Sequence, residues 1–177
     1  MELQDVLQSR RSVRKYRNKE VSDKDIHLII EAAILAPSWK NSQVTRYYVV
    51  KNKEMLEMVK AALPLFNIEN VKDAPVLIIP TIVLNRSGFE RDQSASNELG
   101  NGWGYYDCGM HNMNLLLKAQ ELGLSTLVMG LRDAQRIKQL LNIDDSEAVV
   151  SVIGLGYADI NPEMPKRKTV EDITKFY

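Results

Sequence analysis

The feature that most constrains the fold is a long and mostly apolar helical segment, Tyr105–Leu122. Its polar residues are spaced 4, 3, 4 and 3 positions apart, so they form one narrow stripe along a helix. They are Asp107, His111, Asn114, Lys118 and Glu121. Gly123 follows, the residue type that commonly ends a helix. Because the rest of the circumference is apolar, we expect this helix to be central, either in the core or between two subunits.

The remaining segments predict one α+β domain covering residues 1–177. Short apolar runs predict strands at 46–50, 74–84, 125–129 and 148–157. Within the second run, Pro80 indicates a bend or an edge position, because proline lacks the N–H that an interior strand donates. Amphipathic spacing and capping residues predict further helices at 2–9, 22–36, 53–62 and 133–141. The polar stretch 85–102 is predicted to be a long loop or loose helix that could act as a lid.

Composition excludes several classes of protein. The 177 residues contain 23 Lys and Arg against 23 Asp and Glu, which argues against a dedicated nucleic-acid binder. The single cysteine, Cys108, excludes an internal disulfide and fits a reducing compartment. No apolar run approaches the ~20 residues of a membrane helix, and the first residues do not resemble a signal peptide. We therefore expect a cytoplasmic protein, and His27 and His111 lack the neighbours that a metal site requires.

Two basic segments nevertheless stand out in this neutral chain. The stretch "SRRSVRKYR", residues 9–17, has five cations in nine residues, and "KRK" follows at 166–168. Guanidinium groups bind phosphate through paired hydrogen bonds, although a charge run at a helix end is also often only solvated. Two distant cationic segments in a neutral chain are better explained by one shared small anion than by a nucleic-acid surface.

A polar loop follows the predicted helix at 22–36. The stretch "PSWKNSQ" contains four side chains that both donate and accept hydrogen bonds: Ser38, Asn41, Ser42 and Gln43. Such a set suits the edge of a heteroaromatic ring or a ribityl chain. Simple turn chemistry explains the loop equally well.

The order of these motifs resembles the nitroreductase family of FMN-dependent oxidoreductases. The resemblance rests on "RRSVRKY", "APSWKNSQ", "KDAPVLII", "DCGMHNMNLLLKAQELGLSTLVMG" and "PKRKTVEDI", which together extend over nearly the whole chain. It implies an α+β, nitroreductase-like fold, with a central, mostly antiparallel sheet of four to five strands flanked by helices. It also implies an intertwined homodimer with FMN sites at the subunit interface.

The same resemblance implies which residues contact FMN. The implied contacts to the phosphate and the ribityl chain are Arg10, Arg11 and Ser12. Arg14 is implied to lie near the pyrimidine side of the ring. The contacts to the flavin of the neighbouring subunit are Pro37, Ser38 and Asn41. The backbone at Met129 and Gly130 is implied to lie near flavin N5. Two basic residues near the C-terminus are also implied to contact the phosphate. They are Arg167 and Lys168, and Lys166 replaces one of them if the register differs.

The implied activity is a ping-pong transfer of reducing equivalents from NADH or NADPH, through flavin N5, to a nitroaromatic, a quinone or a similar small acceptor. No catalytic side chain is assigned. The alternatives are a flavin reductase, a dehalogenase or desaturase on the same scaffold, a flavin-storage or redox-sensing protein, and a nucleic-acid or phospholipid binder built on residues 10–17. Trp39 and Lys40 replace residues that are usually small in the family, and Val44 replaces a usual proline. These changes concern the wall beside the flavin and hence the choice of substrate.

Overall fold

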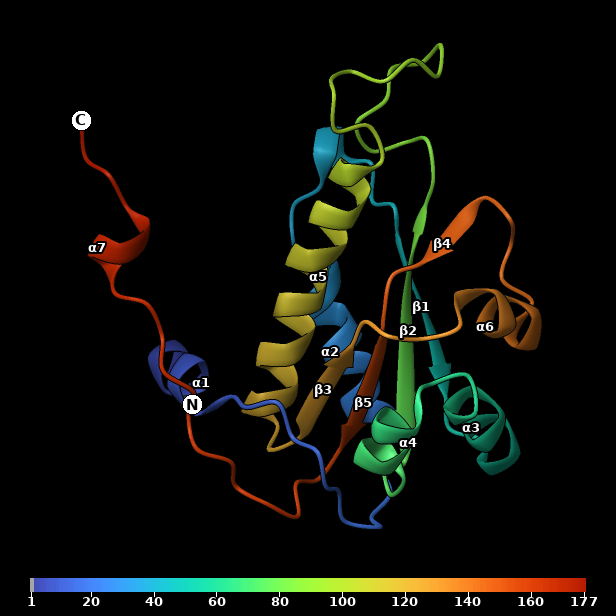
Figure 1. The fold of residues 1–177 in the computed structure, drawn as a ribbon, viewed down its shortest axis with the longest axis vertical. Helices are drawn as coiled ribbons and strands as arrows, with labels where there is room; N and C mark the ends of the chain where they lie inside the picture. Colours follow the sequence, from blue (N-terminus) through green and yellow to red (C-terminus); the bar gives the residue numbers. More distant parts are fainter. Residues whose placement is uncertain (1) are drawn as a thin grey trace.

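The computed structural model describes residues 2–177, which form one five-stranded antiparallel sheet with helices on both faces (Figure 1). The predicted fold class and sheet are therefore confirmed. The strands are β1 (Thr45–Val50), β2 (Val76–Val83), β3 (Ser125–Met129), β4 (Glu147–Val149) and β5 (Val152–Gly156). The helices are α1 (Leu3–Ser9), α2 (Asp23–Ile34), α3 (Lys53–Lys60), α4 (Leu65–Val71), α5 (Gly102–Glu121), α6 (Ala134–Leu141) and α7 (Val170–Ile173), with a short 3-10 helix, η1 (Trp39–Asn41). The sequence prediction lacked α4 and α7.

The central strand is β2, which pairs with β1 on one side and with β4 and β5 on the other. Pro80 therefore lies inside the sheet, and the expected edge position is wrong. The ladder beside it is interrupted, because β4 ends at Val149 and β5 begins at Val152. The Val150 N–H donates to the Pro80 carbonyl at 2.9 Å. Since the N–H and C=O of one strand residue point to the same side, the N–H that Pro80 lacks would face this interruption.

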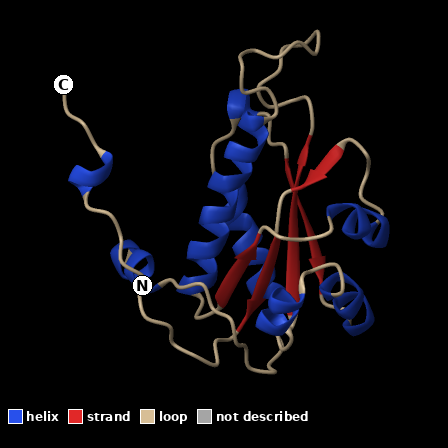
Figure 2. Ribbon diagram, viewed as in Figure 1, coloured by secondary structure: helices blue, strands red, loops and turns tan. Residues whose placement is uncertain are grey.

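The core has two layers, one on each side of the sheet (Figure 2). Side chains alternate along a strand, so Leu77 and Ile79 of β2 pack with α3, α4 and α6. Val76 and Ile78 pack with α2 and α5 on the opposite face. Burial on both faces explains why the run at 74–84 is almost continuously apolar rather than alternating.

Helix α5 is central, as predicted, but the first part of its polar stripe, from Asp107 to Asn114, faces inward. Asp107 and His111 are buried, and Asn114 Nδ2 donates to the Ala32 carbonyl of α2 at 3.1 Å. The solvent-facing side instead carries large apolar groups, among them Tyr106, which is 61% exposed. A well-packed helix thus presents an apolar face to the outside. None of the helices in residues 2–177 is both long and apolar enough to cross a membrane.

The two ends of the chain meet below the sheet. The Arg17 N–H donates to the Tyr157 carbonyl at 2.9 Å, and the Asp159 N–H donates to the Lys15 carbonyl at 3.0 Å. Beyond residue 160 the C-terminal segment runs past α1 and ends, with α7, away from the sheet (Figure 1). The two basic segments are therefore carried by neighbouring stretches of backbone.

Candidate functional site

The N-terminal basic segment is held against the edge strand β3. After α1, Ser12 pairs with Thr126 in a parallel bridge, and the Val13 N–H donates to the Thr126 carbonyl at 3.0 Å. The end of α1 is attached to the end of α5, because Gln120 Nε2 donates to Ser9 Oγ at 3.2 Å. These bonds fix the arginines that flank Ser12 along one side of β3.

Arginines from opposite ends of the chain gather at this place. The pKa of Arg10 is lowered, first by burial and then by the positive charges of Arg167 and Arg11. Within residues 2–177, no salt bridge to a carboxylate involves Arg10, Arg11, Arg14 or Arg167. Arg11 and Arg167 therefore repel Arg10, and none of these three arginines forms an ion pair with a carboxylate in the part of the chain that the structure describes.

Arg11 has an unused donor. Its Nη1 donates to the carbonyls of Gln8 and Arg10 at 2.6 and 2.8 Å, whereas its Nε is buried without a hydrogen-bond partner. A buried N–H without an acceptor is costly. A cavity of about 430 Å³ lies beside it, lined from α1, the basic segment, the ends of α5 and β3, and residues 158–162. The positive charge of the arginines, the free N–H of Arg11 Nε and the neighbouring cavity together suit an anionic ligand.

The predicted backbone contacts lie on the same strand. Met129 ends β3, three residues after Thr126, which corresponds to about 10 Å along a strand. Gly130 is exposed, and its carbonyl accepts a hydrogen bond from Arg132 Nη1 at 2.8 Å. One ligand extended along β3 could therefore reach both Ser12 and Gly130. Arg132 was not predicted, since a single arginine in a loop gives no recognisable pattern.

The predicted loop residues lie elsewhere. Pro37 and Asn41 are exposed, Ser38 is half-buried, and the loop is attached near the start of α5, where Asp107 accepts the Trp39 N–H at 3.1 Å. Along α5, 13 positions separate Asp107 from Gln120, or about 20 Å. Within one chain, the structure thus brings Arg10, Arg11 and Arg167 together but leaves Pro37, Ser38 and Asn41 at the other end of α5. Lys166 and Lys168 are exposed on the C-terminal segment.

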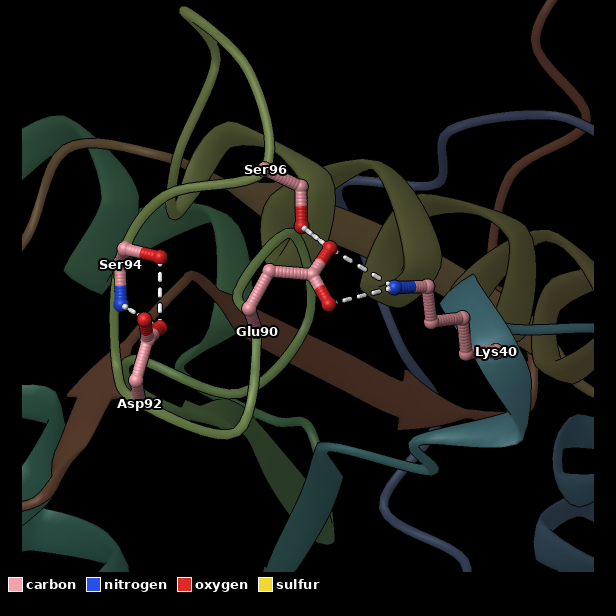
Figure 3. A network of polar contacts seen from close by, with 5 residues as sticks. All are labelled: Lys40, Glu90, Asp92, Ser94 and Ser96. Atoms are coloured by element: carbon pink, nitrogen blue, oxygen red, sulfur yellow. Dashed lines mark hydrogen bonds and ion pairs between the residues drawn. The ribbon is translucent and has the colours of Figure 1, made fainter.

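The stretch 85–101, which we call the cover loop, is a loop as predicted and packs on the Pro37–Gln43 loop. Glu90 accepts Lys40 Nζ at 2.9 and 3.0 Å and Ser96 Oγ at 2.7 Å (Figure 3). The hydrogen bond from Lys40 is the main reason why the pKa of Glu90 is lowered. Beside this network, the rings of Trp39 and Trp103 lie 4.6 Å apart at 46°. Trp39 and Lys40, two of the three residues expected to depart from the family pattern, thus contact the start of α5 and the cover loop, respectively.

Two other candidate groups on α5, Cys108 and His111, are buried. Cys108 is fully buried, and burial raises the pKa of its thiol to about 11, so it is a poor nucleophile near neutral pH. Burial also lowers the pKa of His111, with Asp107 opposing that shift. Across residues 2–177, no group of three or more His, Cys, Asp or Glu side chains is arranged to hold a metal ion.

Fold and site together define an α+β protein with an antiparallel sheet whose edge strand is bordered by unpaired arginines. The family model described as "Nitroreductase family" matches residues 7–157. The chain belongs to the nitroreductase family.

One relative illustrates this membership, and two solved structures share the fold. A Methanothermobacter thermautotrophicus protein named "Putative NADH dehydrogenase/NAD(P)H nitroreductase" is 35% identical over 166 residues, covering 92% of this chain and 80% of that protein. A Staphylococcus epidermidis structure described as "a putative NAD(P)H:FMN oxidoreductase" superposes with a TM-score of 0.89 at 22% identity, covering 99% of this chain and 96% of the other. A Desulfovibrio desulfuricans structure described as "a putative nitroreductase in complex with FMN" gives a TM-score of 0.78 at 24% identity, with coverages of 99% of this chain and 96% of the other.

Proposed function

We propose that this protein is an FMN-dependent oxidoreductase, which takes reducing equivalents from NADH or NADPH and passes them to a nitroaromatic, a quinone or a similar small acceptor in a ping-pong cycle. The observation that carries the proposal is the gathering of Arg10, Arg11 and Arg167 beside β3 without a carboxylate partner. The NAD(P)H in the name of the 35% identical relative and the FMN held by the Desulfovibrio structure support it.

The residues present fit this cofactor. A phosphate monoester carries about −1.5 to −2 charges at neutral pH and offers three strong acceptor oxygens. It would reduce the repulsion that lowers the pKa of Arg10 and supply an acceptor for Arg11 Nε. Arg167 and Lys168 would bind the phosphate from the C-terminal side, and Ser12 would contact the ribityl chain. Arg14 would place positive charge beside the pyrimidine side of the ring, where such charge favours electron uptake.

When bound, FMN supplies the redox chemistry, while the protein binds, orients and tunes it. We assign no side chain as general acid or base. The backbone at Met129 and Gly130 would lie along the ring, and the Pro37–Asn41 loop of the neighbouring chain would complete the wall beside it. In this arrangement one subunit would bind FMN and place positive charge beside it, and the loop of the other subunit would enclose the ring.

The proposal includes an intertwined homodimer with two FMN sites at its interface. Within one chain, Ser38 and Asn41 lie at the opposite end of α5 from Arg10, with about 20 Å of helix between the two points of attachment. Large apolar side chains also remain exposed at the end of α2 and on the C-terminal segment, such as Leu35 at 81% and Phe176 at 87%. A second copy of the chain would cover such surfaces.

The test is the visible spectrum of the pure protein, before and after anaerobic addition of NADH or NADPH. We expect bound flavin, or stoichiometric uptake of added FMN, followed by rapid bleaching with at least one of the two donors. Steady-state assays with a nitroaromatic, a quinone and free FMN then distinguish the acceptor classes. A protein that takes up no FMN contradicts the proposal, and bound FMN that neither donor bleaches favours a storage or sensing protein.

A further inference from the structure

Asp107 is a buried carboxylate that joins two loops. It lies near the start of α5 and is 1% exposed. Both of its oxygens accept the Trp39 backbone N–H at 3.1 Å, and Oδ2 also accepts Ser87 Oγ–H at 2.5 Å. A buried charge is tolerated only when hydrogen bonds replace its hydration. Here the bonds come from the Pro37–Gln43 loop and from the cover loop, not from α5 itself.

The Pro37–Gln43 loop requires such support, because its backbone is unusual. Lys40, Asn41 and Gln43 have φ angles of 45°, 55° and 48°, in the left-handed region that disfavours residues other than glycine. Conformations of this kind persist only where surrounding contacts hold them. Without those contacts, the loop would relax and the side chains of Ser38 and Asn41 would change direction.

Several contacts hold the loop, and three of them illustrate how much these contacts differ in strength. The Gln43 N–H donates to Ser38 Oγ at 3.0 Å, which is a bond within the loop. The ion pair of Lys40 and Glu90 lies on the surface, with both side chains about half exposed, so solvent weakens it (Figure 3). The bond from Trp39 to Asp107 is partly buried and involves a charge, the kind of hydrogen bond that contributes most.

We propose that Asp107 is a positioning residue, which holds the Pro37–Gln43 loop in its flavin-facing conformation and couples it to the cover loop through Ser87. The role rests on the proposed function, because the flavin is what the loop would face. It also explains why the polar stripe of α5 faces inward at this position. The contact between the Trp39 and Trp103 rings gives the same coupling a spectroscopic signal, since two indoles 4.6 Å apart produce an exciton couplet in circular dichroism.

The test compares wild-type protein with Asp107→Asn, which keeps the shape of the side chain and removes its charge. Because both partners of the carboxylate are donors, the amide cannot satisfy them equally well. We expect the Kd for FMN to rise about 10-fold, the loss typical of a weakened hydrogen bond to a charged group. The Kd for riboflavin should rise by the same factor, because the loop would contact the ring rather than the phosphate. The Trp39–Trp103 couplet should weaken, with unchanged helical content.

Two further variants make the result specific. Ser87→Ala removes only the bond from the cover loop, so the FMN Kd should rise by less than in Asp107→Asn. If Asp107→Asn does not fold, Ser87→Ala still tests whether the bonds to Asp107 position the loop. Ile137→Val creates a small defect in the core layer on the other face of the sheet and should lower stability without changing FMN affinity.

The outcomes separate this role from the function on which it rests. Wild-type affinity and an unchanged couplet in both Asp107→Asn and Ser87→Ala would overturn the positioning role alone. An equal loss of affinity in Ile137→Val would show that the effect is general destabilisation, and would overturn it too. A wild-type protein that binds neither FMN nor riboflavin would refute the proposed function and this role together.

Discussion

Replacing Arg167 with Met tests the anion site by changing two quantities in opposite directions. Without ligand, the substitution removes a positive charge that lowers the pKa of Arg10. Like-charge pairs at the surface destabilise by about 0.2–1 kcal/mol, so the ligand-free variant should melt up to about 4 °C higher than wild type. With FMN, the variant loses a hydrogen bond to a charged phosphate, about 1.5–3 kcal/mol, which weakens binding about 10- to 100-fold. A merely structural arginine would not separate stability from affinity in this way.

The assay is a fluorescence titration with FMN and with riboflavin, together with thermal melting of the ligand-free protein. Riboflavin lacks the phosphate, so its Kd should be the same for wild type and Arg167→Met. Lys175→Met, which removes a charge from the same C-terminal segment beyond α7, is the matched control and should bind both ligands normally. The reasoning is refuted if Arg167→Met melts at a lower temperature and binds FMN normally, or if riboflavin and FMN lose affinity equally.

Three further predictions follow from the site and the core. Arg14→Gln should retain FMN but slow its reduction by NADH or NADPH in stopped-flow measurements, and an unchanged rate would remove Arg14 from the mechanism. Light scattering of the FMN-loaded protein should give two chains with two FMN, whereas a monomer holding one FMN would contradict the shared site. Because burial raises the pKa of Cys108 to about 11, the folded protein keeps a proton that the unfolded chain loses, so stability should fall as pH rises from about 9 to 11. Chemical denaturation across this range should show a shallower fall for Cys108→Ala, and identical slopes would argue against a buried thiol.

The elements that the sequence predicted best are those with local signals. Ser22 accepts the Asp25 N–H at the start of α2, and Asp133 accepts the Arg136 N–H at the start of α6, as capping residues do. Gly123 has a φ of 75°, which suits the residue that follows a helix. Such signals act within a few residues and can be recognised without the rest of the fold.

The errors concern contacts between distant segments. The run 148–157 was predicted as one strand, because nothing in it indicates that Val149 and Ile153 pair with different parts of β2. The break is opposite Pro80, so the position of that proline and the division into β4 and β5 have one cause. The sequence also predicted the polar stripe of α5 but not the direction it faces, because the partners of Asp107 and Asn114 lie on distant segments: α2, the loop that follows it, and the cover loop.

The candidate site shows the same division. The cations could be found from their density in a neutral chain, and the resemblance to a family grouped them. That Arg10 and Arg167 lie near each other depends on how the chain ends cross below the sheet, which no local pattern encodes. Asp107 and Glu90 were not predicted as site residues, because a single carboxylate in a helix or loop is common. Only their hydrogen-bond partners in the folded chain distinguish them.

Helix α5 connects the two halves of the proposed site. Gln120 attaches the N-terminal basic segment near one end of the helix, and Asp107 attaches the Pro37–Gln43 loop near the other. The loop cannot approach the arginines of its own chain without breaking its bond to Asp107, because about 20 Å of rigid helix separates the two attachment points. If one flavin contacts both sets, they belong to different chains, and a ligand that binds only the paired state must stabilise the pairing. FMN should therefore lower the concentration at which the dimer dissociates, and riboflavin should do so less, in proportion to the affinity that the arginines add.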